Sequence, residues 1–261
     1  AGALVSEQFA PTAAKTGAIV IDNTSQFRYQ DHIPLVIPEV NPDALINFSS
    51  TNIIANPNCS TIQMLVALQP IHQIAKITKI NVSTYQSVSG AGRKTLDIFN
   101  QQLISDEYPN SDDPMLFAHN VIPQIGEFDE NGHTLEEMKL VWETQKIFND
   151  QEIRVNATAV RVPVRFGHAE AVSIQTEKPI AVNEINRLLQ SSAGIKVLPD
   201  NESYPLPIIH GEGTDDVFVG RIRKDLTMEN GINLWIVAGN IRKGAALNSI
   251  QIAELLIKSY I

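Results

Sequence analysis

The stretch Asn52-Ile-Ile-Ala-Asn-Pro-Asn-Cys-Ser-Thr61 joins a short apolar segment to the start of an amphipathic one. Residues 52–55 have the β-branched, apolar character of a buried strand, and Pro57 ends that segment. From Thr61 onwards apolar side chains recur at helical spacing, at Ile62, Leu65, Val66, Leu68 and Ile71. A strand, a tight turn and a helix in this order indicate an α/β arrangement, with Cys59 in the first turn of the helix.

The flanking segments extend this mixed pattern in both directions. Upstream, a helix is expected over 4–15, closed by Gly17, followed by a buried strand over 18–22. Downstream, strands are expected at 77–86, 154–163, 169–175, 217–223 and 233–238, and helices at 94–104, from Thr134, at 182–190 and at 243–258. Thr134 begins a capping-box pattern, whereas 105–133 is polar and irregular, which suggests a surface excursion or lid.

Composition bounds the class of protein. The 261 residues are enough for one large domain or two modest ones, and 43% hydrophobic with 19% charged residues is typical of a globular chain. With 20 Lys and Arg against 29 Asp and Glu the net charge is -9, which argues against nucleic-acid or membrane partners. One cysteine allows no internal disulfide, no apolar run is long enough to span a bilayer, and a cytoplasmic setting is expected.

Cys59 is the sharpest candidate for chemistry. The free N–H groups and the macrodipole at a helix N-terminus favour a thiolate, so we expect a lowered pKa and a nucleophile. The plain alternative is a buried structural cysteine. His168 could shuttle a proton for such a thiolate, or be an ordinary core or surface histidine.

Other polar residues allow both functional and structural interpretations. Arg161 and Arg165 are four apart, so on a strand they would face one side, either as an anion clamp or as solvated charge. The loop Ser89-Gly-Ala-Gly92 could approach a ligand, but it lacks the third glycine of a dinucleotide fingerprint, which favours a plain turn. Glu136 and Lys139 have the spacing of a solvated helical ion pair.

No Cys/His cluster has metal-ligand spacing, so no metal site is expected.

Five motifs, taken in order, resemble one family. They are Asn56-Pro-Asn-Cys-Ser-Thr61, Thr84-Tyr-Gln-Ser-Val-Ser-Gly-Ala-Gly92, Glu136-Glu-Met-Lys139, Arg161-Val-Pro-Val-Arg-Phe-Gly-His168 and Lys243-Gly-Ala-Ala246. Together with 20–28 and 233–237 they are similar to bacterial aspartate-semialdehyde dehydrogenase over essentially the whole chain. The resemblance implies reduction of L-aspartyl-4-phosphate by NADPH to aspartate semialdehyde, in the route to lysine, threonine and methionine, by a homodimer.

The resemblance also implies roles for individual residues. Cys59 is then the nucleophile that forms a thioester, and His168 the acid/base. The other implied site residues are Gln86, Glu136 and Arg161 for the substrate, Arg28, Asn58 and Lys139 for phosphate, and Ser89, Gly90 and Asn240 for NADP.

The implied fold is α/β, the remnant of a Rossmann-like nucleotide-binding domain plus an α+β catalytic and dimerisation domain with a mixed sheet. The implied division is 1–58 for the NADP-binding part, 59–238 for the catalytic domain and 239–261 for a helix returning to the first part. The family's opening strand and glycine-rich turn do not occur here, so a truncated amino end is expected. Gly239 stands where the family has Asp, and Arg165 where it has an apolar or neutral residue.

Two alternatives stay open from the sequence. The chain could be a substrate-domain or dimerisation module without turnover, because hydride transfer needs a held cofactor. It could also be a Cys/His hydrolase that needs no nicotinamide.

Overall fold

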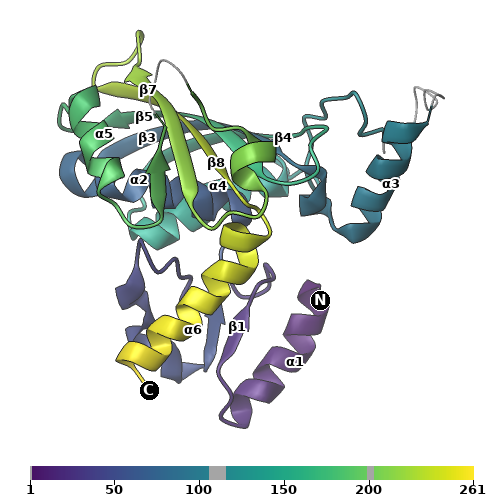
Figure 1. The fold of residues 1–261 in the computed structure, drawn as a ribbon. Helices are drawn as coiled ribbons and strands as arrows, with labels where there is room; N and C mark the ends of the chain where they lie inside the picture. Colours follow the sequence, from purple (N-terminus) through teal and green to yellow (C-terminus); the bar gives the residue numbers. More distant parts are fainter. Residues whose placement is uncertain (1, 106–115, 199–202) are drawn as a thin grey trace.

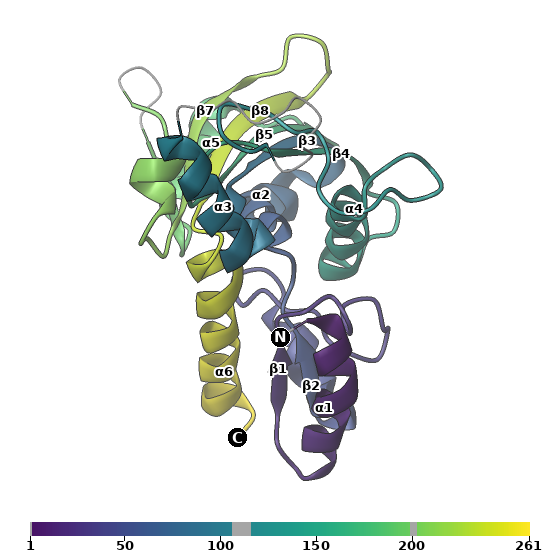
Figure 2. The ribbon, with the colours of Figure 1, turned by 90° about the vertical axis from the view of Figure 1, so that its right-hand side faces the viewer.

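Two β-sheets of unequal size organise the computed structural model over the residues that it describes, 2–105, 116–198 and 203–261 (Figure 1). The smaller is a parallel pair of β1 (Val20–Asp22) and β2 (Ile53–Ala55). Figure 2 shows this pair between α1 (Ala3–Lys15) and α6 (Leu247–Ser259). Apolar side chains of α6 fill the space against the pair, with Ile252 and Ile54 both fully buried.

The larger sheet is mixed and, within the described residues, has the strand order β4-β3-β5-β8-β7-β6. Its strands are β3 (Ile77–Gln86), β4 (Arg154–Arg161), β5 (His168–Thr176), β6 (Ile195–Val197), β7 (Val217–Lys224) and β8 (Gly231–Ala238). β3 runs parallel to β4 and antiparallel to β5, and β8 is antiparallel to both β5 and β7.

Helices α2 (Cys59–Ala75), α4 (Leu135–Phe148) and α5 (Val182–Gln190) pack beside this sheet. The middle of α2 is buried on all sides, which explains why it is apolar around most of its circumference. By contrast, α3 (Arg93–Ile104) projects away from the sheet and packs on its own small cluster of Val88, Leu96, Phe99, Phe117 and Ala118 (Figure 1).

Strand register brings four strand ends together at one end of the sheet. Gln86, the last residue of β3, pairs with Arg161, the last residue of β4. His168 begins the antiparallel β5 and pairs with Ala238, the last residue of β8. Four strand ends therefore meet where α2 begins.

The helices and strands expected from the sequence occur in the structure as helices and strands, respectively. The helix over 182–190 and the capping box at Thr134 are confirmed, and most strand bounds differ by one or two residues. The last helix is an exception, because a π-turn over Arg242–Ala246 precedes α6. A 3-10 helix, η1 (Pro42–Ser50), and strand β6 had no prediction. Of the suggested lid over 105–133, residues 106–115 lie outside the described residues.

Candidate active site

Cys59 is the first residue of α2, and three residues separate it from the end of β2. Asn58 caps this helix, since its Oδ1 accepts the backbone N–H groups of Ser60 at 3.0 Å and Thr61 at 3.4 Å. The chain therefore turns at Asn56–Asn58 and places the thiol at the helix N-terminus, as the sequence predicted.

The sequence predicted a low pKa for this thiol, and that prediction is wrong. Burial raises the pKa of Cys59 to about 12, and the nearby Glu136 carboxylate adds to the rise. Arg28, Arg161 and Lys139 oppose it. The backbone N–H groups and macrodipole of the helix terminus favour the thiolate locally, but the cost of removing a thiolate from water is larger and decides the outcome. Cations around Cys59 are thus the groups that favour the thiolate.

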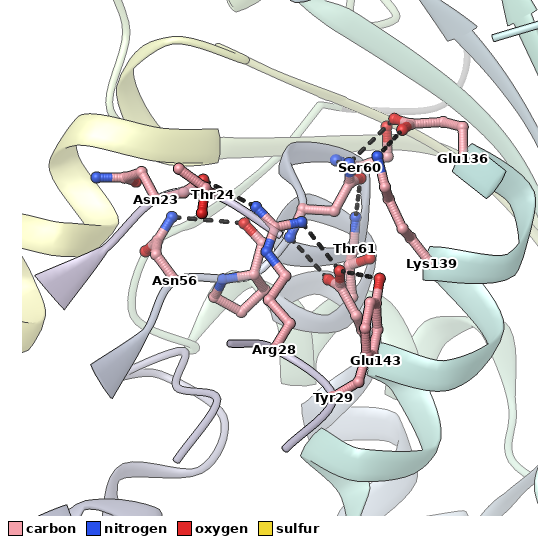
Figure 3. A network of polar contacts seen from close by, with 12 residues as sticks. Asn23, Thr24, Arg28, Tyr29, Asn56, Ser60, Thr61, Glu136, Lys139 and Glu143 are labelled. Atoms are coloured by element: carbon pink, nitrogen blue, oxygen red, sulfur yellow. Dashed lines mark hydrogen bonds and ion pairs between the residues drawn. The ribbon is translucent and has the colours of Figure 1, made fainter. Parts of the chain in front are cut away.

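Glu136, from the first turn of α4, connects the expected substrate and phosphate residues (Figure 3). Its Oε1 accepts from Asn58 Nδ2 at 3.0 Å and Gln86 Nε2 at 3.2 Å, and its Oε2 from Lys139 Nζ at 2.8 Å. Burial alone would raise the pKa of Glu136, but Lys139 and these amides lower it overall. The ion pair expected from the spacing of Glu136 and Lys139 therefore forms, but its carboxylate is almost fully enclosed by protein rather than solvated.

Glu143 is a residue that the sequence analysis missed. Its side chain is fully buried, and Oε1 accepts from the Arg28 guanidinium at 3.0 Å while Oε2 accepts the Asn58 backbone N–H at 2.7 Å (Figure 3). Glu136, Lys139 and Glu143 lie at i, i+3 and i+7 on one face of α4, which is a signal that the sequence did contain. Arg28 is itself buried, and Asn23 O accepts from its Nη2 at 3.0 Å.

Arg161 and His168 lie together across the loop that holds Gly90. A β-carbon at Gly90 would be 3.1 Å from Arg161 Nη1 and 3.2 Å from His168 Cε1, so the loop packs tightly against both side chains. Arg161 Nη1 donates to Ser87 O at 2.7 Å, which leaves the rest of its guanidinium for another partner. Burial lowers the pKa of Arg161, while Glu136 and Cys59 raise it.

His168 is neutral and fixed in one tautomer. Burial and then Arg161 lower its pKa to about 3. Its Nδ1 accepts the Ser87 backbone N–H at 3.0 Å, so the proton of the neutral ring lies on Nε2. Among the residues that the structure describes, this Nε2 has no hydrogen-bond partner although it is buried. A buried donor without a partner suits a bound oxygen atom.

Asn240, two residues beyond β8, lies beside His168. Its Oδ1 accepts the Gly167 N–H at 2.9 Å, and its Nδ2 donates to Ser89 Oγ at 3.0 Å. A cavity of about 280 Å³ adjoins it, lined by Phe166, Gly211, Glu212, Gly213, Gly239, Asn240, Ile241 and Arg242. An amide beside a glycine-lined cavity fits a flat ring that carries a carboxamide, such as nicotinamide.

Arg165 does not share the site with Arg161. β4 ends at Arg161, and Arg165 is exposed in the following loop, where its Nε donates to Asn100 at 2.8 Å. The shared strand face expected from their spacing is therefore wrong. Over the described part of the chain, no group of three or more His, Cys, Asp or Glu is arranged to hold a metal ion, and no helix is long and apolar enough to cross a membrane.

Comparison with known proteins gives consistent matches. The model of the semialdehyde dehydrogenase NAD binding domain matches residues 1–48, and that of the semialdehyde dehydrogenase dimerisation domain matches 68–243. An aspartate-semialdehyde dehydrogenase from Shewanella violacea is 55% identical over all of this chain and 78% of its own length.

Solved structures agree with these matches. Aspartate semialdehyde dehydrogenase II from Vibrio cholerae, complexed with ASA, has a TM-score of 0.95 at 51% identity, over 100% of this chain and 79% of that one. An aspartate semialdehyde dehydrogenase with NADP from Candida albicans has a TM-score of 0.74 at 25% identity, over 98% and 75% of the two chains.

Proposed function

The chain belongs to the aspartate-semialdehyde dehydrogenase family, and we propose from this premise that Cys59 is the nucleophile in NADP-dependent reductive dephosphorylation of L-aspartyl-4-phosphate to aspartate 4-semialdehyde. One observation supports this most directly. Cys59 lies at the start of a buried helix, among cations from α4, β4 and the segment that follows β1.

In this proposal the Cys59 thiolate attacks the acyl carbon, the carbon–oxygen bond to phosphate breaks, and a thioester forms on Sγ. Because burial raises the pKa of the free thiol, the cations Arg28, Lys139 and Arg161 are what favour its ionised form. Nε2–H of His168 donates to the oxyanion that develops at the former carbonyl oxygen, which supports the acid half of its expected acid/base role.

Binding roles follow from free hydrogen-bonding capacity and charge. We assign the substrate's α-carboxylate to Arg161, whose guanidinium fork can pair with it in two bonds, and the α-ammonium to Glu136. Gln86 bridges Ser60 and Glu136 and shapes the same pocket. We assign the phosphate to three donors, which are Lys139, Arg28 and the second N–H of the Asn58 side-chain amide. Lys139 is the most exposed of the three.

The cofactor assignment rests on Asn240 and the glycine-lined cavity beside it. When bound, NADPH supplies the hydride that reduces the thioester. Asn240 would hold the carboxamide, and Ser89 and Gly90 would lie along the same molecule. The expected division at 1–58, 59–238 and 239–261 is retained as part of this proposal, as is assembly into a homodimer through the dimerisation domain.

The test is an assay of NADP reduction with aspartate semialdehyde and phosphate. Cys59→Ala is expected to abolish turnover, and Cys59→Ser to retain a trace, because a hydroxyl ionises far less readily than a thiol. Unchanged turnover in Cys59→Ala would overturn the proposal. Ester hydrolysis that persists without NADP and requires Cys59 would instead support the hydrolase alternative.

A further inference from the structure

The turn between β8 and α6 packs directly on Cys59. A β-carbon at Gly244 would lie 2.7 Å from Cys59 Cβ and 3.2 Å from its Cα, so no side chain fits there. Gly244 N–H donates to Gly239 O at 2.9 Å, with the i to i−5 spacing of a π-turn. Such turns are rare and recur at functional sites. This turn, residues 239–246, forms the wall against which the Cys59 side chain rests.

A buried lysine anchors that turn. Lys243 is 1% exposed, and its Nζ contacts four acceptor atoms, Glu39 Oε1 at 2.8 Å, Glu39 Oε2 at 2.7 Å, Asn248 Oδ1 at 3.0 Å and Gln251 Oε1 at 2.7 Å. Burying an ammonium is costly unless it is paired and fully hydrogen-bonded. Burial lowers the pKa of Lys243, and the Glu39 carboxylate opposes that change.

The contacts of Lys243 continue to the other side of Cys59. Asn248, which accepts from Lys243, donates from Nδ2 to Asn56 Oδ1 at 2.7 Å and to Val36 O at 3.0 Å. Asn56 begins the turn that leads into α2. Lys243 is thus connected both to the turn that packs on the Cys59 side chain through Gly244 and, through Asn248, to the turn that precedes Cys59 in the chain.

The same turn carries Asn240, which we assign to the cofactor. Asn240 lies between Gly239 and Gly244, the two residues that close the π-turn. A displacement of this turn therefore moves the cofactor-side amide and the wall behind the thiol together. Glu39 lies in the segment before η1, so the contact also links the smaller sheet to the active site.

We propose that Lys243 is a positioning residue for the reaction, which holds Gly244 against Cys59 and Asn240 beside the cofactor cavity. Lys243 touches neither the substrate nor the reacting atoms in this account. The inference rests on the proposed role of Cys59 as nucleophile.

The experiment compares wild type with Lys243→Met in the full chain, with exposed Lys178→Met as a matched control. The sequence has one cysteine, so iodoacetamide reports on Cys59 alone. Loss of the wall should expose the thiol, so we expect alkylation at pH 8 to rise about fivefold or more and its pH profile to move to lower pH. Turnover should fall about tenfold or more, with KM for aspartate semialdehyde within about threefold. Lys178→Met should match wild type.

Gly244→Ala serves as the second variant, in case Lys243→Met does not fold. Gly244 is not among the glycines with positive φ, so contacts alone limit alanine there, with Cys59 Cβ at 2.7 Å, Cys59 Cα at 3.2 Å and Gly239 O at 3.4 Å. The same combination of faster alkylation and slower turnover is expected. If both folded variants keep the wild-type alkylation profile and kcat, the inference is wrong. Full turnover in Cys59→Ala would instead refute the proposed function, and the two failures are therefore distinguishable.

Discussion

At the scale of single residues, the site depends on which charges are enclosed together. Glu136 and Glu143 are buried carboxylates on one face of α4, and each is matched by a cation, Lys139 and Arg28 respectively. This pairing keeps two anions near a thiol that must itself ionise. It also explains why the pKa of Cys59 could not be inferred from its helix position, because neither burial nor the position of Glu136 follows from local sequence.

Arg161→Lys tests the assignment of the carboxylate clamp. One guanidinium nitrogen already donates to Ser87 O, and lysine would lose the second bond of the fork. A hydrogen bond to a charged group is worth about 1.5–3 kcal/mol, so kcat/KM should fall about 10- to 100-fold. Arg165→Lys, on the exposed neighbour, is the control and should leave kcat/KM unchanged. An equal kcat/KM for both variants would show that Arg161 does not bind the substrate's carboxylate.

Glu143→Gln tests whether the missed carboxylate supports Arg28 and the Asn58 turn. Glutamine can still accept the Asn58 N–H, but Arg28 is left buried without its counter-charge. Breaking a buried pair costs about 3–5 kcal/mol of unfolding free energy, measured by urea denaturation. Glu177→Gln, which breaks an exposed pair with Lys76, should cost about 1 kcal/mol or less. A loss as small as that in Glu143→Gln would contradict the account.

At the scale of elements, periodicity predicted most helices and strands because apolar faces repeat over many residues. The helix over 182–190 and the capping box at Thr134 are examples. η1 and β6 were missed because a 3-10 segment that starts at a proline and a three-residue strand carry too little periodic signal. The π-turn before α6 was missed for another reason, since it follows from the tertiary contact of Gly244 with Cys59.

Strand β5 contains a buried carboxyl group whose protonation should make stability depend on pH. Glu170 follows His168 by two residues, is fully buried, and burial raises its pKa well above the usual range, with Gln63 opposing. The folded chain thus keeps a proton that the unfolded chain releases above about pH 4.3. Its stabilising effect is complete below that pH and is lost as pH rises toward the folded pKa.

Glu170→Gln should remove this dependence. Urea unfolding of wild type and variant between pH 5 and pH 8 should show a free-energy difference that changes by up to about 1.4 kcal/mol per pH unit, with wild type losing stability as pH rises. Exposed Glu177→Gln provides the control. Parallel curves for wild type and Glu170→Gln would show that the carboxyl is ionised in the folded state.

At the scale of the whole molecule, the site forms where the two sheets meet. Arg28 and Glu39 come from the connection between β1 and β2, and Cys59 begins the helix that follows β2. In the larger sheet, Arg161 ends β4 and His168 begins β5. Residues more than 200 apart in sequence, such as Glu39 and Lys243, are in direct contact. The sequence motifs predicted which residues lie close together, but the contacts by which one of these residues positions another are visible only in the fold.

The mass of the protein after mixing with aspartate semialdehyde and NADP in the absence of phosphate shows directly whether Cys59 carries the thioester. Without phosphate the thioester has no acceptor other than water, so it should accumulate. We predict the added mass of one aspartyl group on the peptide that carries Cys59, with one NADPH formed per site. NADPH formation with no added mass on that peptide would contradict the account.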